Sequence, residues 1–117
     1  MKVLIQNGRV IDPATGLDRV CNLALAAGRI IAIDREPKDF TPSRVIDASG
    51  CIVMPGLVDL AARLREPGHE HEGMLESEMG AAVAGGVTSL VCPPDTDPVL
   101  DEPGLVEMLK FRAEKLH

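Results

Sequence analysis

Short apolar runs separated by turn residues fill the first 55 positions of the chain. The runs cover residues 3–5, 9–11, 20–25, 28–33, 44–47 and 51–54. The turns between the early runs lie at 7–8, 12–16 and 26–28. Asn7-Gly8 is the strongest two-residue hairpin signal, and many short strands with glycine turns are typical of a small β-sandwich or open barrel. The pattern therefore predicts a β-sandwich segment over residues 1–55, with hairpins at 7–8 and 26–28 and a turn at 12–16.

The pattern changes after Pro55-Gly56. A short apolar strand over 57–60 precedes a stretch with helical spacing that ends at Gly85-Gly86, where a glycine commonly follows a helix. An apolar strand over 87–92 comes next, and Asp101 with Pro103 then opens a second helix. Strand, helix, strand and helix with short connections are the opening of a parallel sheet. The sequence therefore predicts an α/β protein whose second domain covers residues 56–117.

Composition and charge argue against several classes of function for this chain. The 117 residues carry 12 basic and 18 acidic side chains, a net charge of −6, and this balance argues against a nucleic-acid partner. No apolar stretch approaches the roughly 20 residues that a membrane span needs. The N-terminus lacks the long apolar core of a signal peptide, so we expect a cytoplasmic protein without a membrane partner. Phe40 and Phe111 are the only Phe, Trp or Tyr residues, which predicts an aliphatic core.

The three cysteines, Cys21, Cys51 and Cys92, contain no Cys-x-x-Cys spacing. This excludes a zinc ribbon or a redox pair written in that form. All three lie in apolar runs, so the sequence predicts buried, reduced and inert thiols.

Polar residues follow the two predicted strands of the second domain, where α/β proteins place their chemistry. Asp59, Ala61, Arg63 and Arg65 are spaced by two residues, so a continuing strand would turn them to one face. One acidic and two basic side chains there indicate a site for an anionic or amide-bearing ligand. An ion-paired strand end with no ligand explains the same residues equally well.

Several motifs resemble a known family. The run from Ile46 to Asp59, IDASGCIVMPGLVD, resembles the entry into the amidohydrolase superfamily. Leu64-Arg65-Glu66-Pro67-Gly68 and Gly85-Gly86-Val87-Thr88-Ser89 narrow the resemblance to dihydroorotase-like proteins, and the segments at 7–13 and 28–33 fit that family's N-terminal sandwich. The resemblance covers the whole chain. It implies a TIM-type (β/α)8 barrel, hydrolysis of a cyclic amide and, in active relatives, zinc.

The chain departs from this family at the residues that hold the metal. Catalytic members carry His-x-His directly before Leu-Arg, and both imidazoles help to bind zinc. Those positions are Ala61 and Arg63 here. Ala61 has no donor atom, and Arg63 is a permanent cation that cannot ligate a metal. We therefore expect no metal at these two positions and no cofactor in this chain.

A remnant of the substrate pocket is the next expectation from the resemblance. Arg65 stands at the position of the family's carboxylate-binding arginine. Asp95 stands where active members have an asparagine that contacts substrate, and an ionised Asp can only accept hydrogen bonds. Arg65 and Asp95 could thus form a remnant anion pocket. Alternatively, Asp95 could simply neutralise Arg65 or Arg63.

His69 and His71 offer a different His-x-His downstream of the lost pair. Together with Glu70 and Glu72 they are a weaker candidate for a relocated metal site. They follow Pro67-Gly68 in a loop, where the sequence indicates nothing that would fix the ligand geometry, so a solvated loop is the favoured interpretation. His117 lies at the chain end and has no evident role.

Length limits what the barrel can be, because a complete (β/α)8 barrel needs about 250 residues. Residues 56–117 provide only the first βαβα units, so an incomplete barrel is expected. The leading hypothesis is a catalytically inactive dihydroorotase-like protein of pyrimidine biosynthesis that supports aspartate carbamoyltransferase or associates with itself. One alternative is an active cyclic amidohydrolase whose remaining ligands lie beyond residue 117. Another is a regulatory module that binds anions through Arg63 and Arg65.

Overall fold

The structure is a computed structural model that describes residues 1–116. The chain divides into two compact units, Met1–Pro55 and Gly56–His117. His117 itself, for which the sequence predicts no role, lies outside the described residues.

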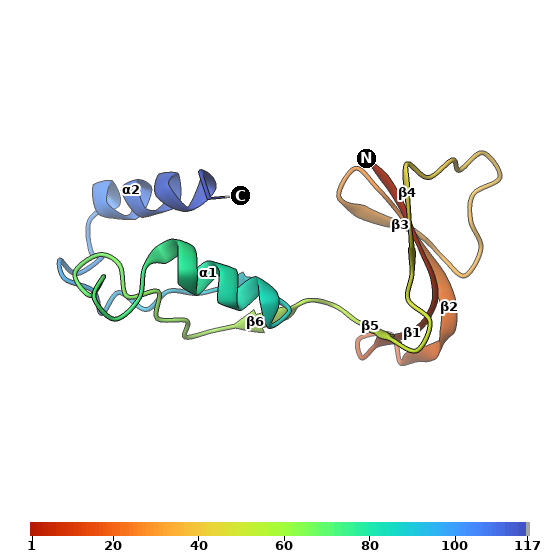
Figure 1. Cartoon of the computed structure of the whole chain (residues 1–117), viewed down its shortest axis with the longest axis horizontal. Helices are drawn as coiled ribbons and strands as arrows, with labels where there is room; N and C mark the ends of the chain where they lie inside the picture. The colour runs from red at the N-terminus through yellow and green to blue at the C-terminus, as the bar shows by residue number, and fades with distance from the viewer. Residues whose placement is uncertain (117) are drawn as a thin grey trace. The chain divides into compact units, whose positions relative to one another are not determined.

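The first unit is a single five-stranded sheet, and Figure 1 labels its strands. They are β1 (Lys2–Asp12), β2 (Leu17–Ala26), β3 (Arg29–Ile33), β4 (Arg44–Asp47) and β5 (Ile52–Val53). The order is β3-β2-β1-β4, and β5 also pairs with β1. The β1–β2 and β2–β3 pairs are antiparallel, whereas β4 and β5 both run parallel to β1.

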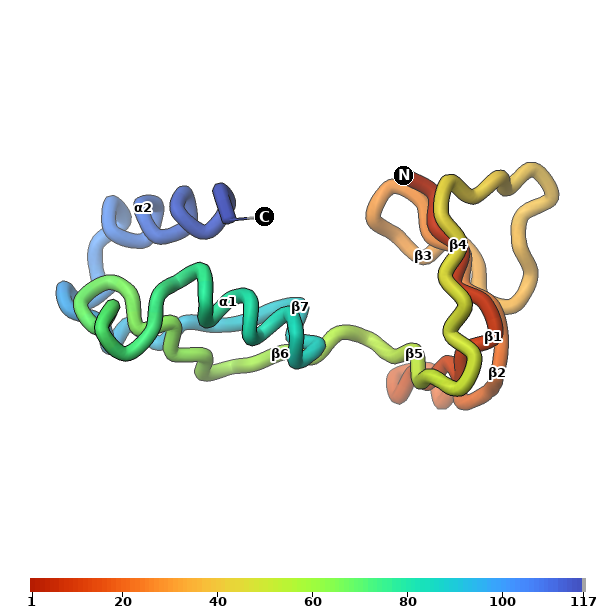
Figure 2. The backbone as a smooth tube through the Cα atoms, in the orientation of Figure 1, coloured from red at the N-terminus to blue at the C-terminus, as the bar shows by residue number. Residues whose placement is uncertain are grey.

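The predicted two-layered sandwich is therefore wrong for the described residues. The reason is the length of β1, which spans 11 residues. Its first half pairs with β4 and its second half pairs with β5, so both short strands join one sheet. Figure 2 shows the chain from β4 to β5 following β1.

The hairpin predicted at Asn7-Gly8 is also wrong. Strand β1 continues through both residues, and the β1–β2 register shifts between Ile5 and Gly8 as in a β-bulge. Asn7 has φ +64°, but Gly8 does not take a left-handed conformation, and a type I′ hairpin needs two such residues in succession. Gly8 is required for space, because a Cβ atom there would lie 2.5 Å from Val53 Cγ2.

The hairpin predicted at 26–28 and the turn predicted at 12–16 are confirmed. Ala27 and Gly28 have φ values of +51° and +72°, so they form the two-residue turn between β2 and β3. The longer turn between β1 and β2 is fixed by Asp12, whose carboxylate accepts hydrogen bonds from the Ala14 N–H and the Thr15 hydroxyl. The core of the unit is aliphatic, as predicted, and it includes a cluster of the buried residues Val10, Cys21 and Leu23.

The prediction for the cysteines holds only in part. All three are free thiols, and Cys21 is buried in the first unit. Cys92 is half-buried and Cys51 is exposed, so the expectation of three buried thiols is wrong. The Cys51 N–H donates to Ala48 O in the turn before β5, and this turn holds the residue at the edge of the sheet.

The second unit contains the predicted strand, helix, strand and helix. They are β6 (Leu57–Asp59), α1 (Leu75–Ala84), β7 (Val87–Leu90) and α2 (Pro103–Glu114). Strands β6 and β7 pair in parallel, with α1 in the connection between them. Figure 1 shows α1 running alongside these strands, and α2 following the loop that leaves β7.

The ends of both helices follow from local chemistry. The Ser77 hydroxyl accepts a hydrogen bond from the Met74 N–H at the start of α1. Gly86, with φ +84°, ends the helix as predicted, because a residue with a side chain is strained in that conformation. Pro103 begins α2 at the position where its missing N–H costs nothing.

The core of the second unit lies between α1, α2 and the loop after β6. Its buried residues are Leu64, Leu75 and Leu109, one from each of these segments. Half-buried apolar side chains that surround them are Met79, Leu90, Cys92, Leu100, Ala113 and Leu116. In the described part of the chain, neither helix has the length and apolar character to cross a membrane.

Candidate functional site

The loops that follow β6 and β7 lie against each other, as the sequence predicts for the site of an α/β sheet. The Ala62 N–H donates to Val91 O at 3.0 Å, which extends the parallel pairing beyond the strands. Farther along, the Asp97 N–H donates to Pro67 O at 3.1 Å. Gly68 permits this close approach, because a Cβ atom there would lie 2.2 Å from Asp97 O. The two loops therefore form one connected surface.

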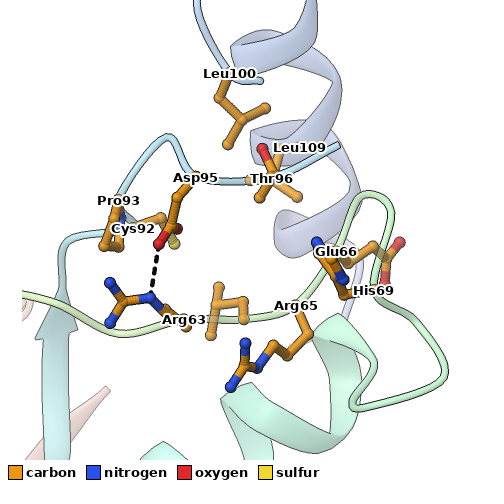
Figure 3. Close-up of a pocket in the computed structure, with 11 residues that line it drawn as sticks. Arg63, Arg65, Glu66, His69, Cys92, Pro93, Asp95, Thr96, Leu100 and Leu109 are labelled. Carbon is orange, nitrogen blue, oxygen red and sulfur yellow. Dashed lines mark hydrogen bonds and ion pairs between the residues drawn. The ribbon is translucent and has the colours of Figure 1, made fainter. Parts of the chain in front are cut away.

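Arg63 and Asp95 join the two loops through their side chains. Arg63 Nε donates a hydrogen bond to Asp95 Oδ2 at 2.7 Å, and the dashed line in Figure 3 marks this contact. Both side chains are about half exposed. Of the two partners that the sequence left open for Asp95, the structure selects Arg63.

Arg65 has a different partner. Its Nη1 lies 3.1 Å from Glu72 Oε2, and Figure 3 shows its side chain extending away from Asp95. Strand β6 ends at Asp59, and the backbone of Arg65 has φ +66°, so the alternation of a strand does not extend to Arg65. The expectation that Asp59 and Arg65 share one face is wrong for this reason. The predicted pair of Arg65 and Asp95 is not a contact in the described structure.

Asp59 and Ala61 lie at the start of the same loop. Asp59 Oδ1 accepts a hydrogen bond from the Ala61 N–H at 2.9 Å, so this carboxylate shapes the turn that leaves the strand. Both residues are exposed. The acidic side chain that the sequence placed among ligand-binding candidates thus has a local structural partner.

Glu66 is the buried charge of the site, with only 2% of its surface exposed. Its Oε2 accepts a hydrogen bond from the Leu75 N–H at 3.0 Å, at the first residue of α1. Its Oε1 forms an ion pair with the Arg112 guanidinium of α2. One carboxylate therefore connects the loop after β6 to both helices, and a helix N-terminus favours a negative charge.

A small cavity of about 40 Å³ lies between these groups. By volume it has room for about three water molecules. Its lining includes Arg63, Arg65, His69, Cys92, Asp95 and Thr96. Partial burial raises the pKa of the Cys92 thiol, so this sulfur is kept protonated and is a poor nucleophile.

The loop between Arg65 and Gly73 is folded on itself. The His69 N–H donates to Arg65 O at 2.8 Å, and the Glu72 N–H donates to His69 O at 2.9 Å. Glu70 accepts the Gly68 N–H, and hydrogen bonds from the backbone N–H groups of Glu70 and Gly68 lower the pKa of its carboxyl group. Hydrogen bonds therefore order the backbone of this loop, while the side chains of Glu70, His71 and Glu72 are exposed, as in the solvated loop that the sequence favours.

This folding brings His69, His71 and Glu72 together. One ligand atom from each side chain lies within 4.8 Å of those of the other two. The sequence named the two histidines with Glu70 and Glu72 as a weaker metal candidate, and the structure brings three of these four residues together.

The positions at which the resemblance implies zinc do not fit that metal. Ala61 provides no donor, and the Arg63 guanidinium is a cation already held by Asp95. A divalent cation beside Arg63 would meet direct charge repulsion. No chemical step through zinc at these two positions is therefore compatible with the residues present.

Three residues of the site were not identified from the sequence as partners, namely Glu66, Glu72 and Arg112. Glu66 and Arg112 are 46 positions apart and have no local signature that links them. The sequence could have indicated Glu72 as a partner of Arg65, because it lies seven residues after Arg65 in a charged segment. That signal could not distinguish it from Glu70 without the fold of the loop.

Comparison with known proteins gives a consistent result. Residues 50–116 match the family described as Dihydro-orotase-like. A dihydroorotase-like protein of Pseudomonas putida is 53% identical over 115 residues, which are 98% of this chain and 27% of that protein. A protein of Pelobacter propionicus named dihydroorotase is 44% identical over the same shares of both chains. This chain spans about a quarter of the length of these relatives.

A solved structure resembles the chain as well. It is the L-hydantoinase (dihydropyrimidinase) of Arthrobacter aurescens, with a TM-score of 0.81 and 28% identity. The match covers 95% of this chain and 24% of the hydantoinase chain. Hydantoinases of this kind are amidohydrolases with the TIM-barrel fold, and the described residues of this chain form a β-rich segment with few helices.

Proposed function

The chain belongs to the dihydroorotase-like family, and from this premise we propose that it is part of a dihydroorotase-like protein without hydrolytic activity. Its role is structural, in pyrimidine biosynthesis, where it supports the assembly of aspartate carbamoyltransferase. Its amidohydrolase ancestry explains the motifs that surround the site.

One observation carries the proposal. Arg63 occupies one of the two positions at which the family's metal-binding histidines are expected, and its guanidinium is bound to Asp95 at 2.7 Å. The residue at the other position, Ala61, has no donor atom. A guanidinium held by a carboxylate fills this end of the sheet with a balanced pair of charges. Such a pair can connect two loops, but it cannot activate water as a metal ion does.

The fold supports the proposal that this chain is part of a larger dihydroorotase-like protein. The parallel β6–β7 pair with α1 between the strands is the repeating unit of a (β/α)8 barrel. Two strands leave unpaired edges, which proteins normally cover. We assign residues 56–117 to the opening of such a barrel, with the remainder of the wall supplied by further chain or by a partner.

The proposal is tested with the purified full-length protein in two experiments. The first measures hydrolysis of dihydroorotate with and without added Zn²⁺, with the Pelobacter propionicus dihydroorotase assayed beside it as a positive control. We expect no turnover above the uncatalysed rate. The second co-expresses the protein with the catalytic chain of aspartate carbamoyltransferase from the same organism, and we expect the two to elute together in size-exclusion chromatography.

The two experiments overturn different parts of the proposal. Zinc-dependent turnover would overturn the inactivity and would favour an active cyclic amidohydrolase with ligands elsewhere in the protein. The 44% identity to a protein named dihydroorotase is the observation that favours this alternative. Separate elution of the two proteins at micromolar concentration would overturn the structural role.

A second candidate function is the binding of anions by the partly exposed guanidinium groups of Arg63 and Arg65. Among residues 1–116 each guanidinium has one carboxylate partner, and each has further N–H donors beyond that contact. Calorimetric titration with dihydroorotate and with N-carbamoyl-aspartate tests this candidate. We expect saturable binding that is lost in Arg65→Ala and strengthened in Asp95→Asn, where a repelling carboxylate is removed. No binding at millimolar ligand would end the candidate.

A further inference from the structure

The group formed by His69, His71 and Glu72 is a second candidate for ligand chemistry, and it is distinct from the positions of Ala61 and Arg63. Its three ligand atoms all lie within 4.8 Å of one another. The His71 Nε2 and Glu72 Oε1 atoms are already 3.7 Å apart. Metal bonds of about 2.0–2.2 Å in a tetrahedron place neighbouring ligand atoms roughly 3.4 Å apart. Small side-chain rotations would therefore bring the group to metal-binding geometry.

The loop holds these residues in place before any ion arrives. Hydrogen bonds from the His69 N–H to Arg65 O and from the Glu72 N–H to His69 O close two successive turns. Glu70 closes the start of the loop through the Gly68 N–H. A site whose backbone is already ordered loses less entropy when it binds a ligand.

Glu72 is oriented by Arg65. The guanidinium lies 3.1 Å from Glu72 Oε2, which leaves Oε1 facing His71. Ligating carboxylates are commonly fixed in this way by a hydrogen-bond donor outside the metal's own ligands. The positive charge of Arg65 opposes a cation, and the negative charges of Glu70 and Glu72 offset it.

We propose that His69, His71 and Glu72 bind a divalent transition-metal ion, with Zn²⁺ as the ion of choice. Two imidazole nitrogens and one carboxylate oxygen suit a borderline ion of this kind and do not suit Ca²⁺ or Mg²⁺, which prefer oxygen ligands. Three protein ligands leave one tetrahedral position for water or an anion. The site goes beyond the proposed function, because it requires neither hydrolysis nor a partner protein.

The test is equilibrium dialysis of metal-free full-length protein against Zn²⁺, followed by elemental analysis. We expect one equivalent of zinc that depends on this loop. His69→Ala and His71→Ala should each weaken binding by about tenfold or more, since loss of an outer partner alone costs this much at metal sites. Glu72→Gln should also weaken it, whereas Glu76→Gln, a matched loss of an exposed carboxylate in α1, should leave it unchanged.

Two further measurements separate this site from zinc binding by a thiol and from a loss of folding. Visible spectra of the Co²⁺-loaded protein should lack a thiolate charge-transfer band, and Cys51→Ser should bind zinc as the unaltered protein does, because the exposed thiol is the obvious competitor. Helical circular dichroism of each variant checks that it folds. Equal zinc binding by the His69→Ala/His71→Ala variant would overturn the proposal, and so would a protein that binds no zinc at millimolar concentration.

Discussion

Arg63 Nε and Asp95 Oδ2 lie 2.7 Å apart, and this hydrogen bond joins the loop after β6 to the loop after β7. The two residues lie in the loops that follow neighbouring parallel strands, 32 positions apart in the sequence. Both are about half exposed, so water screens their attraction. The pair joins two opposite charges at the position where the family resemblance implies a metal in active members, and its effect on stability should be small.

A double-mutant cycle with Arg63→Ala and Asp95→Ala measures this effect. We expect a coupling free energy of at most about 1 kcal/mol at low salt, because exposed ion pairs contribute no more than that. At roughly 1 M salt, where the screening length is about 3 Å, the coupling should approach zero. Urea unfolding followed by helical circular dichroism is the measurement, since both helices lie in the second unit and the chain has no Trp or Tyr. A coupling free energy of several kcal/mol that does not change with salt would contradict this prediction.

Glu66 and Arg112 should behave very differently. Arg112→Met leaves the buried Glu66 carboxylate without its cation, and breaking such a pair from one side costs roughly 3 kcal/mol. Glu66→Gln should cost about 1 kcal/mol, because Arg112 is half exposed and stays hydrated, while the Gln oxygen still accepts the Leu75 N–H. The same unfolding assay compares them. The double variant should be more stable than Arg112→Met alone, and a double variant no more stable than Arg112→Met would contradict the role of the buried charge.

Local patterns in the sequence predicted the elements that local chemistry determines. The turn at Ala27-Gly28 and the end of α1 at Gly86 are correct, because each depends on a left-handed residue that the sequence marks. Asn7-Gly8 also has the sequence of a two-residue turn, but it forms a bulge within β1 instead. Its neighbours decided the outcome, since Val53 packs against Gly8 from a strand more than 40 residues away.

The charged contacts of the site were harder to predict for a related reason. The sequence placed Arg63, Arg65 and Asp95 near one another, but it could not assign the pairs. The positive φ of Arg65 turns that residue toward Glu72, and no periodic pattern reveals a single backbone angle. The contact of Glu66 with Arg112 depends on how α2 packs on the loop, which is tertiary information.

Glycines 68 and 80 provide a matched pair of substitutions in the second unit. Gly68 has φ +99°, and a Cβ atom there would meet Asp97 O at 2.2 Å, so Gly68→Ala should lower the free energy of unfolding by roughly 1–3 kcal/mol. Gly80 lies within α1 with nothing within 4 Å of a Cβ atom, so Gly80→Ala should raise it by about 0.5–1 kcal/mol. Urea unfolding of the two variants should shift in opposite directions. Equal shifts of the two unfolding curves would show that the loops after β6 and β7 do not lie as close together at Gly68 as the structure indicates.

Asp47 provides a prediction for pH in the first unit. Its carboxylate accepts hydrogen bonds from the Ser49 hydroxyl, the Asn7 side-chain amide and the Ser49 N–H, and these lower its pKa in the folded protein. A depressed pKa means that the stabilisation is present above the unfolded value of about 3.9 and disappears as the pH falls through the folded value. Asp47→Asn cannot lose a charge, so its stability should decline less steeply between neutral pH and pH 3, roughly the range in which such carboxyls titrate.

Hydrogen exchange of the Ala48 amide is the measurement for Asp47, because this N–H donates to Gln6 O beside the carboxylate and reports on the first unit alone. Protection in the unaltered protein should fall steeply in acid. In Asp47→Asn the protection should still fall in acid, but less steeply. The remaining fall is expected because the Arg9 guanidinium also lowers the pKa of Asp18 in the same sheet. Asp39→Asn is the control, because within residues 1–116 the Asp39 side chain accepts no hydrogen bond, and its profile should match that of the unaltered protein. Parallel profiles for Asp47→Asn and the unaltered protein would mean that the three hydrogen bonds do not stabilise the charged carboxylate, and that Asp18 carries the acid sensitivity of the sheet.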